Sequence, residues 1–355
     1  MAWAGHELPI YPSYYPHEID IATLAPEQAL DLIEHGQIQA YVGAVPPPAS
    51  PPDSVSAVES LGSLIVVAVN PDLPRDPCAV TAAVIDELAA HGGDFVLHPY
   101  PVTPFHGDYL YHADLATAAK RRWSESGVEG PKGLKVKAIG ALARSLMRED
   151  SQTQALDWDA EVASVDADAM VGRAMTTVNG WVGPPWLRKG WFQADLLLGD
   201  TPTDPEAKTR TAADVGRLTA GDYEDAAERI NLERDLVRLL SGGCRKTVAG
   251  YTVRRHYFNN DYSAGIENIA YDSVAGFATP MFLRTAKLKD FPWNGWLGIG
   301  TDARPTAAWN PVAGFTDNFG RLMWFALGDP AVLPAPNDSG WTINRIADVA
   351  ATPAR

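Results

Sequence analysis

An unbroken apolar run constrains the fold of this chain more than any other feature. Residues 61–69 (LGSLIVVAV) are rich in β-branched side chains and end at Asn70-Pro71, which is typical of a buried strand. Residues 76–90 follow as a predicted helix, with Asp76 as N-cap and Pro77 in the first turn. Residues 95–97 (FVL) then indicate a second strand. Strand, helix and strand in this order predict a parallel βαβ unit, and therefore an α/β fold.

The length of 355 residues exceeds what one hydrophobic core usually supports. With 46% hydrophobic and 21% charged residues, the chain is expected to be a folded globular protein with two lobes. We expect an α/β fold, with parallel or mixed sheets flanked by helices and a loop-rich C-terminal part. The predicted parts are residues 1–125 as an α/β domain with a ligand loop at 98–114, residues 126–245 as a mainly helical part with a Trp-rich loop at 181–192, and residues 246–355 as strands and loops that complete the second lobe.

Local signals predict further elements. Helices are expected at residues 26–35, 114–122, 134–148 and 222–240, and strands at 38–43 and 248–258. Residues 202–215 are polar and are expected to be an exposed segment. In the 222–240 helix, the spacing of Glu224/Glu228 and Arg229/Glu233 predicts surface charges.

Charge and hydropathy exclude several partner classes. A net charge of −15 and a pI near 4.9 disfavour nucleic acid and anionic lipid as partners, and the most apolar segment is too short to cross a bilayer. The sequence begins without the features of a signal peptide, so a soluble cytoplasmic protein is expected as written, or a periplasmic one if an export signal has been removed. Cys78 and Cys244 have no metal-binding spacing and do not decide between these compartments.

Residues 98–114 (HPYPVTPFHGDYLYHAD) hold three of the eight histidines. They follow the strand expected at 95–97, and ligands in open α/β sheets bind outside the carboxyl ends of strands. We therefore expect a ligand loop in this segment. Its predicted ligand-binding residues are His98, Tyr100, His106, Asp108, Tyr109 and His112.

The same segment offers ligands for a metal. In an extended chain His106, Asp108, His112 and Asp114 share one face, whereas in a helix only Asp108 and His112 pair. His98, His106 and His112 are the predicted ligands if a divalent transition metal is bound; the cofactor is otherwise unknown. The alternative is that Asp108 or Asp114 caps a helix and the histidines make ordinary hydrogen bonds.

A second candidate lies in the strand expected at 248–258. Arg254, Arg255 and His256 are adjacent there, and arginine side chains bind carboxylate or phosphate groups through two parallel hydrogen bonds. These three residues are predicted to bind an anionic ligand, and the alternative is an ion pair with an acidic side chain of the protein.

Tryptophans and one cysteine form the remaining candidates. Five tryptophans lie in Gly/Pro-rich segments, where they either stack on a ligand or anchor loops: Trp181, Trp186, Trp191, Trp293 and Trp296. Trp186 is included among the predicted ligand contacts.

Cys244 follows a helix end, whose partial negative charge disfavours a thiolate. We therefore interpret Cys244 as incidental to a helix C-cap rather than as a nucleophile.

Residues 26–43 (PEQALDLIEHGQIQAYVG) resemble a segment of type II periplasmic solute-binding proteins, in which a helix, a glycine and a short strand lead toward the ligand cleft. The aromatic and Pro-rich residues 11–16 (YPSYYP) resemble the segment that follows the first strand in that family. The resemblance covers residues 8–43 and implies a two-lobed binding protein.

Three functions follow as hypotheses. The first is a soluble binding protein that holds a small polar or anionic ligand in an interdomain cleft. The second is a metal-dependent hydrolase or oxidoreductase built on His98, His106 and His112, with Asp108 as base or orienting residue. The third is a non-catalytic subunit that meets a protein partner in a larger assembly.

Overall fold

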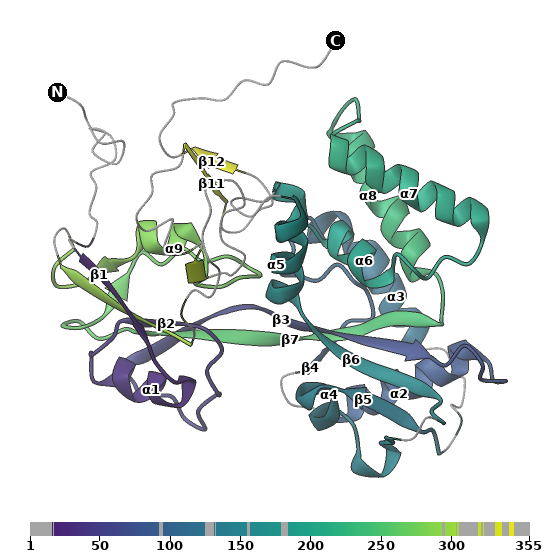
Figure 1. Ribbon diagram of the computed structural model, residues 1–355, viewed down its shortest axis with the longest axis horizontal. Coiled ribbons are helices and arrows are strands. Elements are labelled where there is room, and N and C mark those ends of the chain that lie inside the picture. Colours follow the sequence, from purple (N-terminus) through teal and green to yellow (C-terminus); the bar gives the residue numbers. More distant parts are fainter. Residues whose placement is uncertain are drawn as a thin grey trace. The chain divides into compact units, whose positions relative to one another are not determined.

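A mixed β-sheet is the framework of the protein, as seen in the computed structural model (Figure 1). The structure describes residues 16, 18–91, 95–124, 131, 133–154, 157–178, 184–292, 295–302, 304, 319–320, 322, 331–335 and 341–343. The strands are β1 (Glu18–Thr23), β2 (Ala40–Val42), β3 (Val55–Val69), β4 (Phe95–Leu97), β5 (Val136–Ile139), β6 (Ala160–Asp166), β7 (Lys246–Asn259), β8 (Ile266–Glu267), β9 (Lys287–Leu288), β10 (Trp296–Thr301), β11 (Val332–Pro334) and β12 (Trp341–Ile343). The helices are α1 (Pro26–Glu34), α2 (Pro77–His91), α3 (Ala113–Ser124), α4 (Ala141–Leu146), α5 (Ala167–Val178), α6 (Gly190–Leu198), α7 (Pro205–Ala220), α8 (Ala226–Ser241) and α9 (Pro280–Thr285), with short 3₁₀ turns η2 (Tyr109–Tyr111), η3 (Glu149–Ser151) and η4 (Pro185–Arg188).

The chain divides into two compact units. Unit 1 comprises Met1–Ser60, Gly172–Pro185 and Arg254–Arg355, and unit 2 comprises Leu61–Val171 and Trp186–Val253. Strands β3 and β7 each cross a unit boundary, so one part of each strand belongs to each unit. The sheet is mixed, because β1·β10, β10·β2 and β5·β6 are parallel while β2·β7, β3·β6 and β4·β7 are antiparallel. The expected two-lobed α/β class is confirmed, and the predicted division at residues 125 and 245 stays a prediction.

Unit 2 has its core between the C-terminal part of β3 and helix α2. The apolar run at residues 61–69 is buried on both faces, and α2 packs Val84, Ile85 and Leu88 against Ile65 and Val67. Helix α2 is mostly apolar in sequence, and its exposed residues are Cys78, Asp86, Ala89 and Ala90. These contacts anchor the start of the segment that follows β4.

The predicted direct βαβ pairing is wrong in one respect. Strands β3 and β4 flank α2 as expected, but β4 pairs antiparallel with β7, with Val96 opposite Tyr251, whereas β3 pairs antiparallel with β6. Strand β7, which is distant in sequence, supplies the hydrogen-bonding edge for β4. Because β4 has only three residues, it has little pairing preference of its own. The carboxyl end of β4 still leads into the 98–114 segment.

Unit 1 has a separate aromatic and aliphatic core. Phe277 and Phe282 stack with ring centroids 4.2 Å apart, and Leu297 and Ile299 of β10 are fully buried. Helix α1 begins with Pro26 in its first turn and ends before Gly36, whose φ of +67° suits glycine. The predicted helix, glycine and strand of residues 26–43 are confirmed as α1, Gly36 and β2.

Two local predictions need correction. The helix expected at 134–148 is strand β5 followed by the short helix α4, because Gly140 at φ +91° separates them and β5 pairs with β6 inside the acidic segment. The polar segment at 202–215 is mostly exposed, as expected, and it contains the start of helix α7, which Asp204 caps by accepting from the Ala207 N–H at 2.9 Å. The helix expected from residue 222 begins instead at Ala226 as α8.

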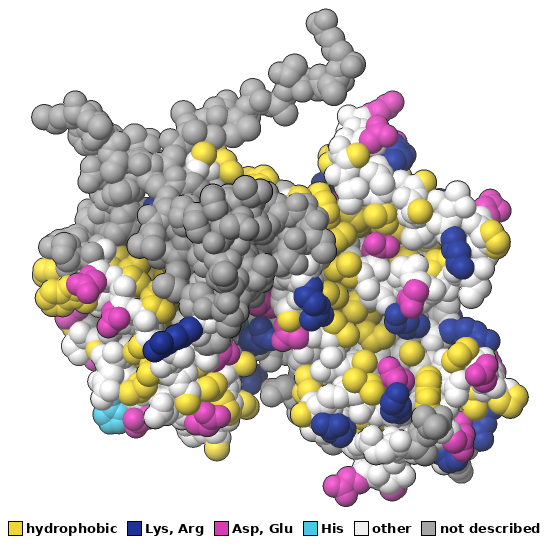
Figure 2. Space-filling view, viewed as in Figure 1, with side chains coloured by type: hydrophobic (Ala, Val, Ile, Leu, Met, Phe, Trp, Pro, Cys, Tyr) yellow, Lys and Arg dark blue, Asp and Glu magenta, His cyan; other side chains and the backbone are white. Residues whose placement is uncertain are grey.

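The surface carries both signs of charge. On the face shown in Figure 2, Lys and Arg side chains lie among Asp and Glu side chains, and the described residues there form no continuous basic patch. No helix in the described ranges has the length and apolar character needed to cross a membrane.

Candidate functional site

The 98–114 segment folds as a series of tight turns within unit 2. The Tyr109 N–H donates to the His106 carbonyl at 3.0 Å, and the His112 N–H donates to the Tyr109 carbonyl at 2.8 Å, which forms η2 and leads into α3. The chain is thus neither extended nor α-helical between residues 106 and 112. These turns bury His106, Asp108 and His112, of which Asp108 and His112 have no exposed surface.

Asp108 caps a helix that begins far along the chain. Its two carboxylate oxygens accept from the Gly190 N–H at 3.0 and 3.1 Å, and one also accepts from the Trp191 N–H at 3.4 Å. These are the first amides of α6, whose own N-cap residue, Lys189, provides no side-chain cap. A Cβ on Gly190 would lie 2.4 Å from Val102 Cγ1, so glycine permits the close approach. Helix capping is one of the two roles that the sequence left open for Asp108.

His112 is oriented by Tyr100. The Tyr100 hydroxyl and His112 Nδ1 are 2.9 Å apart and both side chains are buried. His112 Nε2 is buried and has no hydrogen-bond partner among the described residues. Burial is the main cause that lowers the pKa of His112 to about 4, so the ring is neutral near pH 7. Burial likewise raises the pKa of Tyr100 well above its ordinary value.

The ring of His106 is held in place through its Nδ1 atom. Its Nδ1 accepts from the Thr103 N–H at 2.9 Å, which leaves the proton of the neutral ring on Nε2. That Nε2 atom and both polar atoms of the Gln193 amide are buried and without partners in the described part of the chain. Burial lowers the pKa of His106, and the charge of Asp108 opposes that shift.

Glu233 of α8 joins these residues from a different part of the sequence. Only 1% of its surface is exposed, which corrects the expectation of a surface charge. Its Oε1 accepts from Arg229 Nη1 at 2.7 Å and lies 3.5 Å from Lys189 Nζ, while its Oε2 is buried without a partner among the described residues. Burial is the largest effect on the pKa of Glu233 and raises it; the Lys189 ammonium opposes the shift.

These five residues form what we call the buried polar cluster: His106, Asp108, His112, Gln193 and Glu233. One potential metal-binding atom from each of Asp108, His112 and Glu233 lies within 4.8 Å of the others. The predicted set of His98, His106 and His112 is different from this group. That set stays a prediction, and Glu233 is the member that the sequence did not indicate.

His98 and Tyr109 line the exit from β4. His98 Nε2 donates to the Val102 carbonyl at 2.9 Å, and its ring lies 5.9 Å from that of Tyr109 and 5.7 Å from that of Tyr251. Burial lowers the pKa of His98, and the hydrogen bond to Val102 opposes the shift.

Asp114 lies outside the buried polar cluster. It binds Arg234 of α8 through two hydrogen bonds of 2.7 and 2.8 Å, and Arg234 also donates to the Tyr111 carbonyl. The hydrogen bond from Arg234 is the main cause that lowers the pKa of Asp114 to about 2. This pair ties the start of α3 to α8.

The tryptophans of the 181–192 segment pack on one another. The ring centroid of the partly buried Trp186 lies 4.7 Å from that of Phe192 and 6.2 Å from that of Trp191. The Trp191 side chain is 1% exposed. Loop anchoring, the alternative raised from the sequence, describes these contacts. Trp181 and Trp293 lie outside the described residues, and Trp296 on β10 is 69% exposed.

The Arg254, Arg255 and His256 group belongs to unit 1. Arg255 forms an ion pair with Glu59 at 3.2 Å, the alternative considered for this group. His256 is 2% exposed, its Nε2 lies 2.8 Å from Ser60 Oγ, and its ring lies 5.4 Å from that of Phe277. Burial, followed by the charge of Arg254, lowers the pKa of His256 to about 3.

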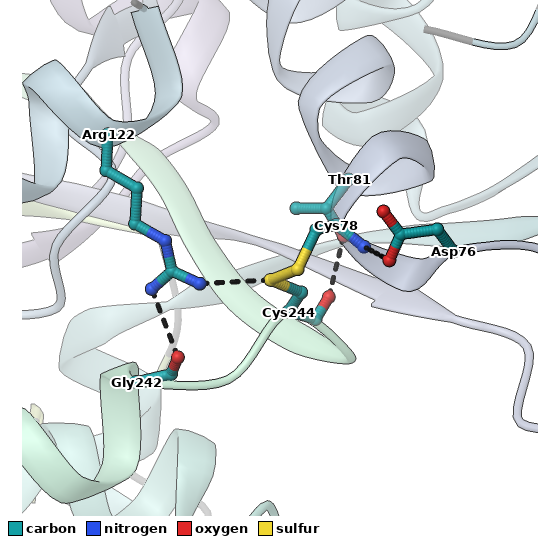
Figure 3. Close-up of a disulfide and its surroundings, with 6 residues drawn as sticks. All are labelled: Asp76, Cys78, Thr81, Arg122, Gly242 and Cys244. Atoms are coloured by element: carbon teal, nitrogen blue, oxygen red, sulfur yellow. Dashed lines mark hydrogen bonds between the residues drawn. A yellow bond between two sulfur atoms is a disulfide. The ribbon is translucent and has the colours of Figure 1, made fainter. Parts of the chain in front are cut away.

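The two cysteines are joined in a disulfide that the sequence did not indicate (Figure 3). Cys78 at the start of α2 and Cys244 before β7 are 166 residues apart, with Cα atoms 4.8 Å from each other. Arg122 donates to Cys244 Sγ at 3.0 Å and to the Gly242 carbonyl at 3.1 Å, and Thr81 Oγ1 donates to the Cys244 carbonyl at 2.7 Å. Cys244 is therefore no free thiol nucleophile.

Comparisons with known proteins give only distant structural similarity. No protein-family model and no curated protein matches the sequence. Several of the solved structures that resemble it are described as oligopeptide- or substrate-binding proteins. They include the oligopeptide-binding protein AppA of Bacillus subtilis in complex with a nonapeptide (13% identity, TM-score 0.39, covering 75% of this chain and 59% of that one). OppA of Haemophilus influenzae gives 11% identity and a TM-score of 0.37, covering 74% of this chain and 56% of that one.

A substrate-binding protein of Microbacterium hydrocarbonoxydans, complexed with 4-hydroxybenzoate hydrazide, is similar at 13% identity and a TM-score of 0.36, covering 77% of this chain and 57% of that one. The chain therefore spans between 56% and 59% of the length of these three structures. The resemblance noted for residues 8–43 agrees with these neighbours. At such low similarity, no ligand and no residue role is carried over from them.

Proposed function

We propose that this chain is a solute-binding protein that captures a small polar or anionic ligand. The observation that carries the proposal is the division into two compact units, each with its own core, with β3 and β7 passing through both. A chain of two separately packed units is a common architecture among ligand-binding proteins.

The disulfide supports an exported protein. Disulfides persist in oxidising compartments and are rare where glutathione keeps thiols reduced. Cys78 and Cys244 are distant in sequence, and Cys244 is buried in the unit 2 core, so the bond is part of the packed structure. Of the two compartments expected from the sequence, this favours the periplasmic one.

For an anionic ligand we propose Arg254 as the principal contact. It is the first residue of the part of β7 that belongs to unit 1. Its positive charge acts to lower the pKa of both His256 and Asp302. Arg255, its neighbour, is held by Glu59. A guanidinium group can bind a carboxylate through two hydrogen bonds.

A thermal-shift screen followed by calorimetry tests the proposal. Small organic anions and inorganic phosphate are the probes; at least one class should raise the melting temperature, and the rise should increase with the logarithm of its concentration. Arg254→Gln should weaken binding of that ligand by about 10-fold or more, because a charged hydrogen bond contributes about 1.5–3 kcal/mol. Arg255→Gln is the matched control and should bind as the wild type. Absence of any shift across the panel would contradict the proposal.

A further inference from the structure

We infer that Asp108, His112 and Glu233 form a binding site for a divalent transition metal inside unit 2. The inference is separate from solute binding, because all three residues lie within one unit. Their potential ligand atoms lie within 4.8 Å of one another, and their exposed fractions are 0%, 0% and 1%.

Two buried atoms without partners point to a ligand at this place. His112 Nδ1 is engaged by Tyr100, so Nε2 is its free nitrogen; Glu233 Oε1 is engaged by Arg229, so Oε2 is its free oxygen. Both free atoms are buried without a hydrogen-bond partner among the described residues. Burying such an atom without a partner is unfavourable, and a shared cation would remove this cost.

Each metal-binding side chain is already held by a second residue. The Gly190 and Trp191 amides orient the Asp108 carboxylate, the Tyr100 hydroxyl orients the His112 ring, and Arg229 orients Glu233. Second contacts of this kind fix ligand direction and tautomer in known metal sites. Metal binding requires the tautomer in which Nδ1 of His112 donates to the Tyr100 oxygen 2.9 Å away, because Nε2 then presents a lone pair.

The set of ligands selects the class of ion. One imidazole and two carboxylates suit Zn²⁺ and its spectroscopic substitute Co²⁺, which bind such atoms at about 2.0–2.2 Å. The three candidate atoms lie within 4.8 Å of one another, which is close enough for them to approach one ion together. The two carboxylates balance the charge of a dication, while Lys189 and Arg229 beside Glu233 limit the site to a single ion.

The experiment uses the full chain with its disulfide intact. Protein unfolded with chelator is refolded either with Zn²⁺ or with Co²⁺, desalted, and analysed for metal content and for the visible absorption of tetrahedral Co²⁺. One equivalent of metal per chain is expected, together with a higher melting temperature than that of metal-free protein. Folded wild type that retains no metal overturns the inference.

Variants locate the ion. His112→Gln and Glu233→Gln should each abolish stoichiometric binding and the Co²⁺ spectrum, and Tyr100→Phe should weaken binding by about 10- to 100-fold. His98→Gln, a partly buried histidine in the same segment, is the control and should bind one equivalent. Circular dichroism reports whether each variant folds. If His112→Gln does not fold, metal binding by Glu233→Gln and Tyr100→Phe decides whether the ion binds at this site. Unchanged binding in the folded variants assigns the ion elsewhere and refutes this site.

The two proposals can fail independently. Metal content is measured without any solute, and the solute screen is run on metal-free protein. Loss of metal binding in Glu233→Gln with solute binding intact would support both.

Discussion

At the scale of single residues, Asp108 acts on a helix end 82 positions away. Asp108→Ala leaves the buried Gly190 and Trp191 amides without their acceptor. We expect the free energy of unfolding of metal-free protein to fall by about 2–3 kcal/mol, because an unsatisfied buried donor bears its full desolvation cost. Urea unfolding measures this change.

Asp204→Ala is the matched control for Asp108→Ala. Asp204 is an exposed cap that accepts from its own helix, so its loss should cost only about 1 kcal/mol. Equal losses in the two variants would mean that the distant cap contributes nothing beyond an ordinary one.

His256 should make stability depend on pH. Its pKa is about 3 in the fold and 6.5 when the ring is solvated, so the folded state excludes a proton that the unfolded chain binds. The stability that depends on a neutral His256 ring is fully present above pH 6.5. It is lost as the pH falls toward 3, and the free energy of unfolding then decreases by at most about 1.4 kcal/mol per pH unit. Urea titrations at several pH values between 7.5 and 5 measure the slope.

His256→Gln removes the titrating ring and keeps a polar atom toward Ser60. The variant should be less stable than the wild type at neutral pH, yet lose stability less steeply on acidification. Identical slopes for the two proteins would show that His256 is not the group that titrates.

The sequence indicated part of the site at this scale. It singled out His106, Asp108 and His112 because they are close together in the chain, and the structure buries all three. It placed Glu233 on the surface, because an i,i+4 pair with Arg229 is typical of exposed helix faces. The Glu233 carboxylate is buried because α8 packs against the 98–114 segment and α6.

At the scale of elements, the turn at residues 272–276 covers His256. Gly276 has φ +61°, and a Cβ there would lie 1.9 Å from His256 Nε2. Gly276→Ala should therefore lower the free energy of unfolding by about 1 kcal/mol for the backbone and by about 1–3 kcal/mol more for the clash. Chemical denaturation of the variant measures the sum.

Gly221→Ala provides the comparison for Gly276→Ala. Gly221 ends α7 at φ +71° with nothing within 4 Å of a Cβ, so only the backbone cost of about 1 kcal/mol is expected. If both alanine variants lose the same stability, the ring of His256 moves aside without cost.

Elements with strong end signals were predictable. Pro26 and Gly36 bound α1, and Pro77 begins α2, as the sequence indicated. The β5 and α4 region was misread as one helix, because its apolar residues fit a helical period and the break depends on the conformation of Gly140. Strand β5 is also stabilised by β6, a pairing that no local signal specifies.

At the scale of the whole molecule, the disulfide closes a loop of 166 residues in sequence. Replacing both cysteines with alanine should lower the free energy of unfolding by about 3–5 kcal/mol, since a long loop restricts the unfolded chain strongly. Reduced wild type should unfold at the same denaturant concentration as the double variant. Arg122→Gln, which removes a contact to Cys244 but keeps the bond, should change stability far less; a comparable loss would contradict the cross-link explanation.

Long-range pairing limited what the sequence could predict at this scale. The α/β class followed from the apolar run and its neighbouring helix, but Glu18 pairs with Trp296 and Phe95 with Thr252, and periodicity within a segment does not identify such partners. Cysteine spacing likewise gave no sign of the disulfide, because its geometry depends on β7 returning beside α2.

The pairing of β1 with β10 also sets an order of events during synthesis. A chain that leaves the ribosome from its N-terminus can complete unit 2 once Val253 has emerged, whereas β1 must wait for Trp296–Thr301. Until then Ile19 and Ile21 belong to a strand whose partner does not yet exist, and an unpaired strand edge is prone to wrong association. A nascent chain of this protein therefore needs β1 shielded until β10 has been synthesised.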